Sequence, residues 1–124
     1  MDLLLDTHAF LWWSLADSRT RASWVEHIAD PANTVYLSAA TAWEVSIKRR
    51  AGKLRFEQST VEAASFHSFT WLPITPGDAE AAGSLDWDHR DPFDRMLVAQ
   101  AIGHDLVIVT ADDTVRNAPG VRVL

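Results

Sequence analysis

The chain has 124 residues, of which 48% are hydrophobic, and this is typical of one folded domain spanning 1–124 and excludes a disordered chain. No cysteine is present, which excludes disulfides and thiolate metal sites, and neither a signal peptide nor a membrane span of roughly 18 apolar residues is found. The net charge of −6 argues against non-specific nucleic-acid binding, and we expect a soluble cytoplasmic protein.

Short apolar runs alternate along the chain with stretches of helical periodicity. The predicted strands cover residues 2–5, 34–37, 71–74, 106–109 and 121–124. The predicted helices cover 7–16, 21–29, 39–51, 60–69, 76–84 and 92–104, with a short helical turn after Asp112. This alternation predicts an α/β fold with a mainly parallel sheet of four to five strands.

Acidic residues follow two of the predicted strands. The apolar run 3–5 ends at Asp6, and the fourth strand is followed by Asp112 and Asp113. Ligands of open parallel sheets bind beyond the carboxyl ends of the strands, so we expect Asp6 and Asp112 at the same rim. Taken singly, each has an ordinary alternative, because an aspartate at this position also caps the helix that follows it.

A glutamate interrupts the apolar face of the helix predicted at 39–51. At about 100° per residue, Ala40, Trp43, Ile47 and Ala51 fall on one arc, and Glu44 lies at its edge. We therefore expect Glu44 to face the packed side, where an ionised carboxylate needs a partner, a metal or a raised pKa. An internal salt bridge is the alternative to a functional site.

A third acidic position lies at the start of the helix predicted at 92–104. Asp91 precedes Pro92 and is expected to be the N-cap. Asp94 is then the third helical residue, and its neighbours one turn on are apolar, which points it toward the packed side. The alternative is a residue that only complements the helix dipole.

If Asp6, Glu44, Asp94 and Asp112 meet, their repulsion determines the chemistry. Two carboxylates about 4 Å apart repel by about 4 kcal/mol at an effective dielectric constant near 20. Such a cluster must bind protons or cations, and an all-oxygen ligand set suits Mg²⁺ or Mn²⁺. Ions of this kind polarise phosphates and activate water for in-line displacement.

Basic residues are concentrated in one short segment. Five of the eleven lie within eight positions, and they are Lys48, Arg49, Arg50, Lys53 and Arg55. From Glu57 onward there are eleven acidic residues against four basic ones. Two interpretations of the segment stay open: a solvated helix C-terminus, and a patch that contacts phosphate groups, with Lys48, Arg49, Arg50 and Lys53 as contacts.

Four segments in order carry a resemblance to a known family: LLLDTHAFLWW, LSAATAWEVSIKRRAGKL, DPFDRMLVAQA and VTADD. They resemble the PIN-domain nucleases, and more closely the VapC-type toxins of type II toxin–antitoxin systems. The resemblance implies a three-layer α/β/α fold and a Mg²⁺- or Mn²⁺-dependent endoribonuclease that leaves a 5′-phosphate and a 3′-hydroxyl. It assigns metal binding and catalysis to Asp6, Glu44, Asp94 and Asp112.

The resemblance also suggests supporting roles for polar neighbours of these acids. Thr7 and Thr110 match hydroxyl positions that orient water or ligands, although a plain helix-start or strand-end threonine is equally credible. Asp113 is a substitute candidate at the fourth acidic position. His8 has no metal-ligand partner at a useful spacing, so we expect a packed or surface imidazole.

The resemblance further implies two protein partners, a second copy of the chain and a small VapB-type antitoxin that fills a groove near the site. The candidate groove residues are Phe10, Leu11 and Trp13, in a segment that also holds Trp12, and Trp24 follows nearby. Tryptophan is enriched at protein interfaces. The competing interpretation is core packing, and we expect both uses within this set.

Three other functions are weighed against this one. A signalling receiver domain requires a lysine near the C-terminal end, but no lysine follows Lys53. A PIN-like binding module without catalysis would have no need to keep all four acidic positions. A PIN nuclease of ordinary RNA processing shares the same residues, and the neighbouring genes would distinguish it from a toxin.

Overall fold

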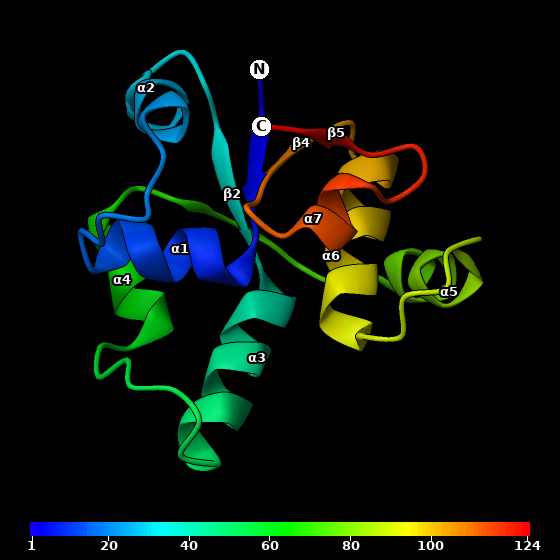
Figure 1. Cartoon of the computed structure of the whole chain (residues 1–124), viewed down its shortest axis with the longest axis horizontal. Coiled ribbons are helices and arrows are strands. Elements are labelled where there is room, and N and C mark those ends of the chain that lie inside the picture. The colour runs from blue at the N-terminus through cyan, green and yellow to red at the C-terminus, as the bar shows by residue number, and fades with distance from the viewer.

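The computed structural model describes residues 1–124 and contains a five-stranded, fully parallel sheet. The strands are β1 (Leu3–Leu5), β2 (Val35–Ser38), β3 (Thr70–Leu72), β4 (Val107–Val109) and β5 (Arg122–Val123). Their order across the sheet is β3-β2-β1-β4-β5, so β1 lies in the middle with β2 and β4 as its neighbours (Figure 1). All three leucines of β1 are fully buried, as the apolar run predicted.

Seven helices connect and cover the strands. They are α1 (Thr7–Ser14), α2 (Ala22–Ala29), α3 (Ala39–Arg50), α4 (Thr60–Phe66), α5 (Pro76–Ser84), α6 (Pro92–Gly103) and α7 (Asp113–Arg116). The helices α1 and α4 end two and three residues earlier than predicted, because Ala16 and Ser68 adopt positive φ angles of 51° and 60°, which a helix does not accommodate. None of these helices is both long and apolar enough to cross a membrane.

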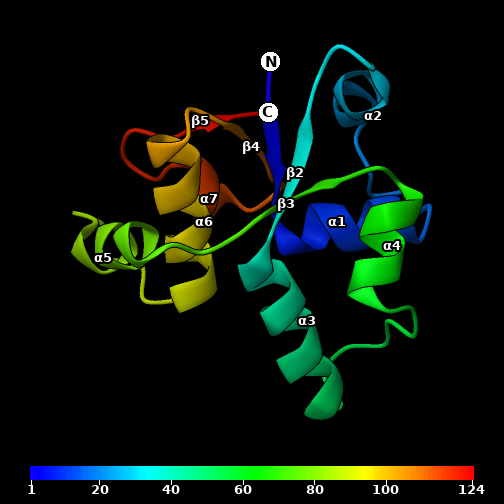
Figure 2. The same ribbon diagram turned by 180° about the vertical axis from the view of Figure 1, so that it is seen from behind.

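Two hydrophobic cores lie on opposite faces of the sheet. Leu3 and Leu5 belong to the core shared with α1, α2 and α4, which includes the fully buried Trp24. Leu4 points to the other face and packs in the core under α6 and α7, with Leu97 among its members. Figures 1 and 2 show α1, α2 and α4 on one side of the sheet and α5, α6 and α7 on the other. The predicted three-layer α/β/α architecture is confirmed.

Three helices begin directly where strands end, which determines where polar groups can gather. Asp6 caps α1 after β1, Ser38 caps α3 after β2, and Asp112 caps α7 after a short loop from β4. Because the three strands are parallel neighbours, these caps lie along one rim of the sheet. The caps of α1 and α7 are two of the acidic residues singled out in the sequence.

Candidate active site

Asp6 is a buried carboxylate at the end of β1, with 5% of its surface exposed. Its Oδ1 accepts a 2.8 Å hydrogen bond from the Ala9 backbone amide, so the predicted capping role is real. Burial raises its pKa to about 6, against hydrogen bonds from Thr110 and Ala9 and the charge of His8, which lower it. The charge of Asp94 adds to the increase. Capping therefore accounts for one oxygen, while the carboxylate as a whole is costly to ionise.

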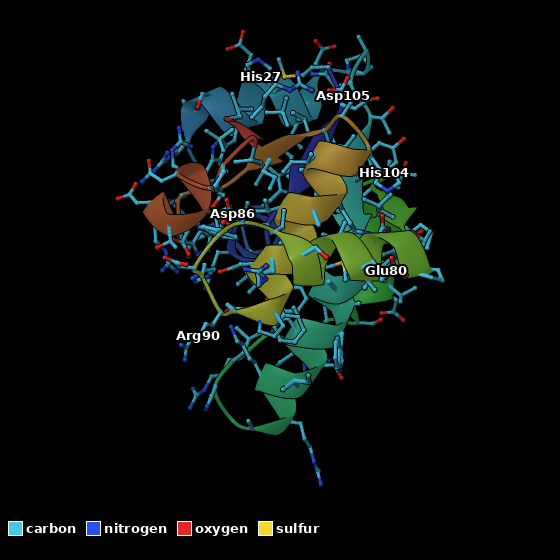
Figure 3. All side chains as sticks on the ribbon, turned by 90° about the vertical axis from the view of Figure 1, so that its right-hand side faces the viewer. His27, Glu80, Asp86, Arg90, His104 and Asp105 are labelled. Carbon is cyan, nitrogen blue, oxygen red and sulfur yellow. The ribbon has the colours of Figure 1, made fainter.

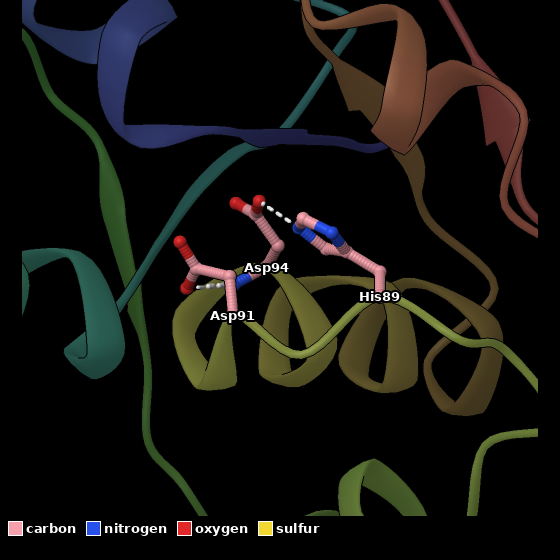
Figure 4. A group of neighbouring side chains, drawn as sticks. All are labelled: His89, Asp91 and Asp94. Carbon is pink, nitrogen blue, oxygen red and sulfur yellow. Dashed lines mark hydrogen bonds and ion pairs between the residues drawn. The ribbon is translucent and has the colours of Figure 1, made fainter.

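Asp94 stands on the first turn of α6 and is half-buried. Its Oδ2 lies 2.7 Å from Nε2 of His89. Burial raises the pKa of Asp94, the His89 hydrogen bond lowers it, and the charges of Asp91 and Asp112 raise it. In Figure 4 its carboxylate points away from α6 toward the ribbon of β1 and α1. Asp94 thus interacts electrostatically with both Asp6 and Asp112, from a different element.

Glu44 is buried in the middle of α3, with 5% exposed, as predicted. Its Oε1 accepts a 2.6 Å hydrogen bond from the hydroxyl of Thr7, the residue next to Asp6. Its Oε2 forms a 2.5 Å ion pair with Nζ of Lys48, so the alternative of an internal salt bridge is also present. This hydrogen bond raises the pKa of Lys48, and the charges of Asp91 and Asp94 add to it. Glu44 therefore reaches the acidic rim through Thr7 and Lys48.

Asp112 completes the rim from the β4 side. Its Oδ1 accepts from the Thr114 amide at 2.9 Å, and its own amide donates to the Thr110 hydroxyl at 3.0 Å. Thr110 also hydrogen-bonds Asp6, so this threonine ties the two strand ends together. Asp113 follows on the first turn of α7 and is exposed.

An open pocket of about 300 Å³ lies at this rim. It is lined by Asp6, His8, Trp12, Arg19, Ala111 and Asp112. His8 is exposed there, as the surface interpretation predicted, and its ring lies 6.0 Å from that of Trp12. The guanidinium of Arg19 lies 4.8 Å from the Trp12 ring and forms an ion pair with Asp17.

His89 is a neighbour of the site that the sequence did not single out. His89, Asp91 and Asp94 present ligand atoms within 4.8 Å of one another (Figure 4). Asp91 is the predicted N-cap, because its Oδ1 accepts from the amides of Phe93 and Asp94. The only sequence signal for His89 was its position five residues before Asp94, in a polar segment without periodicity.

The loop that carries His89 is held by Arg95. The Arg95 guanidinium donates hydrogen bonds to the backbone carbonyls of Ala82, Gly83, Leu85, Trp87 and His89. One side chain on α6 thus fixes the whole connection from α5. This arrangement keeps the His89 ring against Asp94.

The prediction for the apolar face of α3 was wrong. Trp43 and Ile47 are exposed, and the buried side of the helix consists of Ala40, Thr41, Glu44 and Val45. Helical spacing identified an arc of apolar residues but not the direction in which the helix leans. Because α3 runs past the end of the sheet, it is covered only where it meets α1, α4 and α6 (Figure 1).

The prediction for the antitoxin groove needs a correction as well. Phe10 and Leu11 are core residues, and the Phe10 ring packs edge-on against Phe56 and Phe69, so neither lines a surface groove. Trp13 is half-buried and lines an open pocket of about 490 Å³ together with Ala16, Asp17, Thr20, Val25 and His67. Trp24, which follows on α2, is fully buried.

The basic residues between positions 48 and 55 differ in whether their side chains contact the rest of the protein. Lys48 pairs with Glu44, and Arg49 donates to the Gln58 carbonyl at 2.8 Å while lying 5.9 Å from the Phe56 ring. Arg50 and Lys53 are exposed and form no side-chain hydrogen bond. Arg55 is exposed as well, so these three residues carry the charge of the segment that is open to solvent.

The donor set of the rim fits a hard divalent cation. Its acidic groups offer carboxylate oxygens, and the chain has no cysteine thiolate to offer. Burial and mutual charge raise the pKa values of Asp6 and Asp94, so the ionised site needs a cation to balance it. Asp6 and Asp112 line one pocket, and Asp94 lies near enough for its charge to act on both, whereas Glu44 is held by Thr7 and Lys48.

Comparison with known proteins supports this architecture. The family model described as PIN domain matches residues 3–121. VapBC2 from Rickettsia felis, solved with a DNA fragment from its promoter, is similar with a TM-score of 0.73 and 14% identity, covering 100% of this chain and 98% of that one. DNA-bound VapBC from Salmonella typhimurium has a TM-score of 0.70 and 18% identity, covering 100% and 97%. Comparison with curated protein sequences gave no match.

Proposed function

The chain belongs to the PIN-domain family of nucleases, and from this premise we propose that it is a Mg²⁺- or Mn²⁺-dependent endoribonuclease that acts as a toxin. The observation that carries the proposal is the electrostatic interaction of Asp94 with both Asp6 and Asp112 across the rim. The pKa values of Asp6 and Asp94 are raised, and a bound cation would favour the ionised form of both carboxyl groups. Glu44, hydrogen-bonded to Thr7, is the proposed fourth ligand.

The proposed reaction is hydrolysis of an RNA phosphodiester bond by water. A divalent cation held by Asp6, Glu44, Asp94 and Asp112 would supply polarisation of the phosphate and activation of the water. Thr7 and Thr110 hold the carboxylates of Glu44 and Asp6 by hydrogen bonds, which keeps the oxygens in fixed positions. Glu44 or Asp94 is the proposed group that assists in removing the proton of the attacking water. Asp113, exposed beside Asp112, is a proposed substitute ligand.

We propose a VapB-type antitoxin as the partner, a homodimer as the assembly, and the cytoplasm as the location. The similar structures from Rickettsia felis and Salmonella typhimurium are VapBC complexes. Trp13 and the pocket of about 490 Å³ that it lines are the surface proposed for the antitoxin. Arg50 and Lys53, which are free of internal contacts, are the proposed long-range attraction for RNA, and Lys48 and Arg49 join them when their present partners release them.

The experiment that tests the reaction compares wild type with Asp94→Asn. The wild-type protein is expected to cleave RNA in the presence of Mg²⁺ or Mn²⁺ and to lose this activity in EDTA. Its expression is expected to arrest the growth of the host cells. Asp94→Asn should lose about 10²-fold or more of the cleavage rate and all of the growth arrest. Asp105→Asn is the matched control, because Figure 3 places Asp105 at the far end of α6. Equal toxicity of wild type and Asp94→Asn would overturn the proposal.

A second measurement tests cation binding without activity. Addition of Mg²⁺ at about 100 times its dissociation constant should stabilise wild type by about 2.7 kcal/mol. The thermal midpoint of Asp6→Asn or Asp94→Asn should respond much less, while Asp105→Asn responds as wild type does. An identical response in all four proteins would show that the ion binds elsewhere.

A further inference from the structure

An exposed pair of aromatic rings flanks the acidic rim. Trp43 on α3 leaves 60% of its surface in solvent, and its ring meets that of Phe93 on α6 edge to face, with centroids 5.2 Å apart. Each ring belongs to the residue directly before an acid of the site, Glu44 or Asp94. A tryptophan this exposed contributes little to the core, so we infer that its ring contacts a binding partner beside the site.

The exposed surface of α3 continues from this pair in a defined order. Ile47 is one turn beyond Trp43, with 43% exposed, and Arg50 is the next residue on the same face. These positions are four and seven residues on from Trp43, the spacing of one helix face. The face therefore begins with an aromatic ring beside the acids and ends with an unpaired cation about 10 Å away along the helix axis.

We propose that this face (Trp43, Ile47 and Arg50, with Phe93) binds single-stranded RNA, with a base stacked on Trp43 and the backbone drawn along α3 toward Arg50. The inference rests on the proposed function, since it assigns the surface by which the substrate reaches the site. Every nucleobase has a π-face, so an exposed indole binds bases without selecting a sequence. Arg50 supplies charge opposite to that of phosphate.

The order of residues favours RNA over a protein partner. A polyanion approaching carboxylates needs a contact beside the acids that is not itself charged, and stacking provides one. The cation stands at the remote end, where it attracts phosphates without competing with the proposed metal site. The ring pair also bridges α3 and α6, the two elements that carry Glu44 and Asp94, so a base stacked there lies next to the acidic rim.

The test measures binding of a single-stranded RNA oligonucleotide labelled with 2-aminopurine, in EDTA so that no cleavage occurs. Loss of one stacked base corresponds to about 5- to 150-fold in affinity, which is the reduction expected for Trp43→Ala. Trp43→Phe keeps a ring and should retain most of the affinity. Phe66→Ala is the matched control, because Phe66 is an aromatic residue 83% exposed on α4, a helix across the sheet from α6, and should bind as wild type does.

Salt dependence separates the two kinds of contact. Trp43→Ala should lower affinity equally at low and high salt, whereas Arg50→Ala should reduce the slope of log affinity against log salt by up to about 1. With Mg²⁺ present, Trp43→Ala should raise KM for RNA and leave kcat within about threefold of wild type.

Two results would overturn the inference while leaving the proposed function intact. One is wild-type RNA affinity in Trp43→Ala. The other is a change of Trp43→Ala from dimer to monomer in sedimentation, which would assign the face to a second copy of the chain. A wild-type protein that neither binds the oligonucleotide nor cleaves RNA with any divalent cation would instead remove the proposed function itself.

Discussion

The hydroxyl of Thr7 donates a 2.6 Å hydrogen bond to Oε1 of Glu44 and so joins the first residue of α1 to the buried middle of α3. The two residues are 37 positions apart, and they belong to the helices that follow β1 and β2, two neighbouring strands of the same parallel sheet. Glu44 has one oxygen on Thr7 and the other on Lys48. A buried carboxylate is therefore satisfied by two donors, and each of them matters.

Replacement of Thr7 by valine, which has the same shape without the hydroxyl, tests this dependence. Loss of one donor to a buried charged group is expected to lower the free energy of unfolding by about 1–3 kcal/mol. Urea unfolding at pH 7 in EDTA measures it. Thr20→Val is the matched control, because the buried Thr20 hydroxyl has no hydrogen-bond partner and its removal should be neutral or stabilising. Equal losses in the two variants would contradict the role of the Thr7–Glu44 bond.

The sequence predicted the rim well because its signals are local and topological. The apolar run of β1 is buried on both faces, and Asp6 and Asp112 follow strands that are parallel neighbours, so their side chains had to share one edge. Pro92 after Asp91 located the start of α6, which in turn fixed the direction of Asp94. Capping and the proposed metal binding use the same residues there, which is why each acid alone was ambiguous.

Other features depend on contacts that no periodicity reveals. Trp43 was expected inside because its arc is apolar, but α3 extends beyond the sheet and buries a neighbouring arc instead. Phe10 and Leu11 lie in an almost uniformly apolar helix, where spacing does not separate core from surface. The position of His89 depends on a loop pinned by Arg95, a contact invisible in the sequence.

The raised pKa of Asp6 leads us to predict that the stability of the protein depends on pH in the absence of divalent ions. Its pKa is about 6 in the folded protein against 3.8 for an ordinary aspartate. Between these values the folded protein holds the proton that the unfolded chain has released, so the free energy of unfolding falls as pH rises from about 4 to about 6. A shift of about two units corresponds to a loss of up to about 3 kcal/mol, complete above pH 6.

Asp6→Asn removes this contribution and keeps an oxygen that can cap α1. Urea unfolding of wild type and Asp6→Asn at pH 4 and pH 7 in EDTA should show the variant gaining about 2–3 kcal/mol relative to wild type at the higher pH. Some slope remains in the variant because the pKa of Asp94 is raised as well. Asp113→Asn, an exposed control, should follow wild type. Parallel curves for Asp6→Asn and wild type would contradict the burial effect.

The contacts of Arg95 lead us to predict that this residue keeps the loop that carries His89 ordered beside the site. Its five carbonyl contacts depend on the fixed fork of a guanidinium, which lysine does not reproduce. Arg95→Lys should lower the free energy of unfolding by about 2–3 kcal/mol and speed hydrogen exchange of residues 84–91. Arg90→Lys is the control, since Arg90 projects from the same loop into solvent (Figure 3). Unchanged exchange in Arg95→Lys would mean that the loop is ordered without it.

The position of Trp13 leads us to predict that its substitution weakens antitoxin binding without affecting catalysis. Its indole Nε1 donates to Nδ1 of His67 at 3.3 Å, and the two rings form one wall of the apolar pocket of about 490 Å³ beside α1 and α2. Large aromatic residues in such pockets are the usual hot spots of interfaces, so Trp13→Ala should weaken binding of the purified cognate antitoxin by about 10- to 30-fold. RNA cleavage should persist, because Trp13 does not line the pocket at Asp6 and Asp112.

Titration calorimetry measures the affinity for the antitoxin. The control is Ile102→Ala, which changes a half-exposed residue of α6. Unchanged affinity in Trp13→Ala would place the antitoxin on another surface, and a parallel loss of cleavage would show that the substitution acts through the fold.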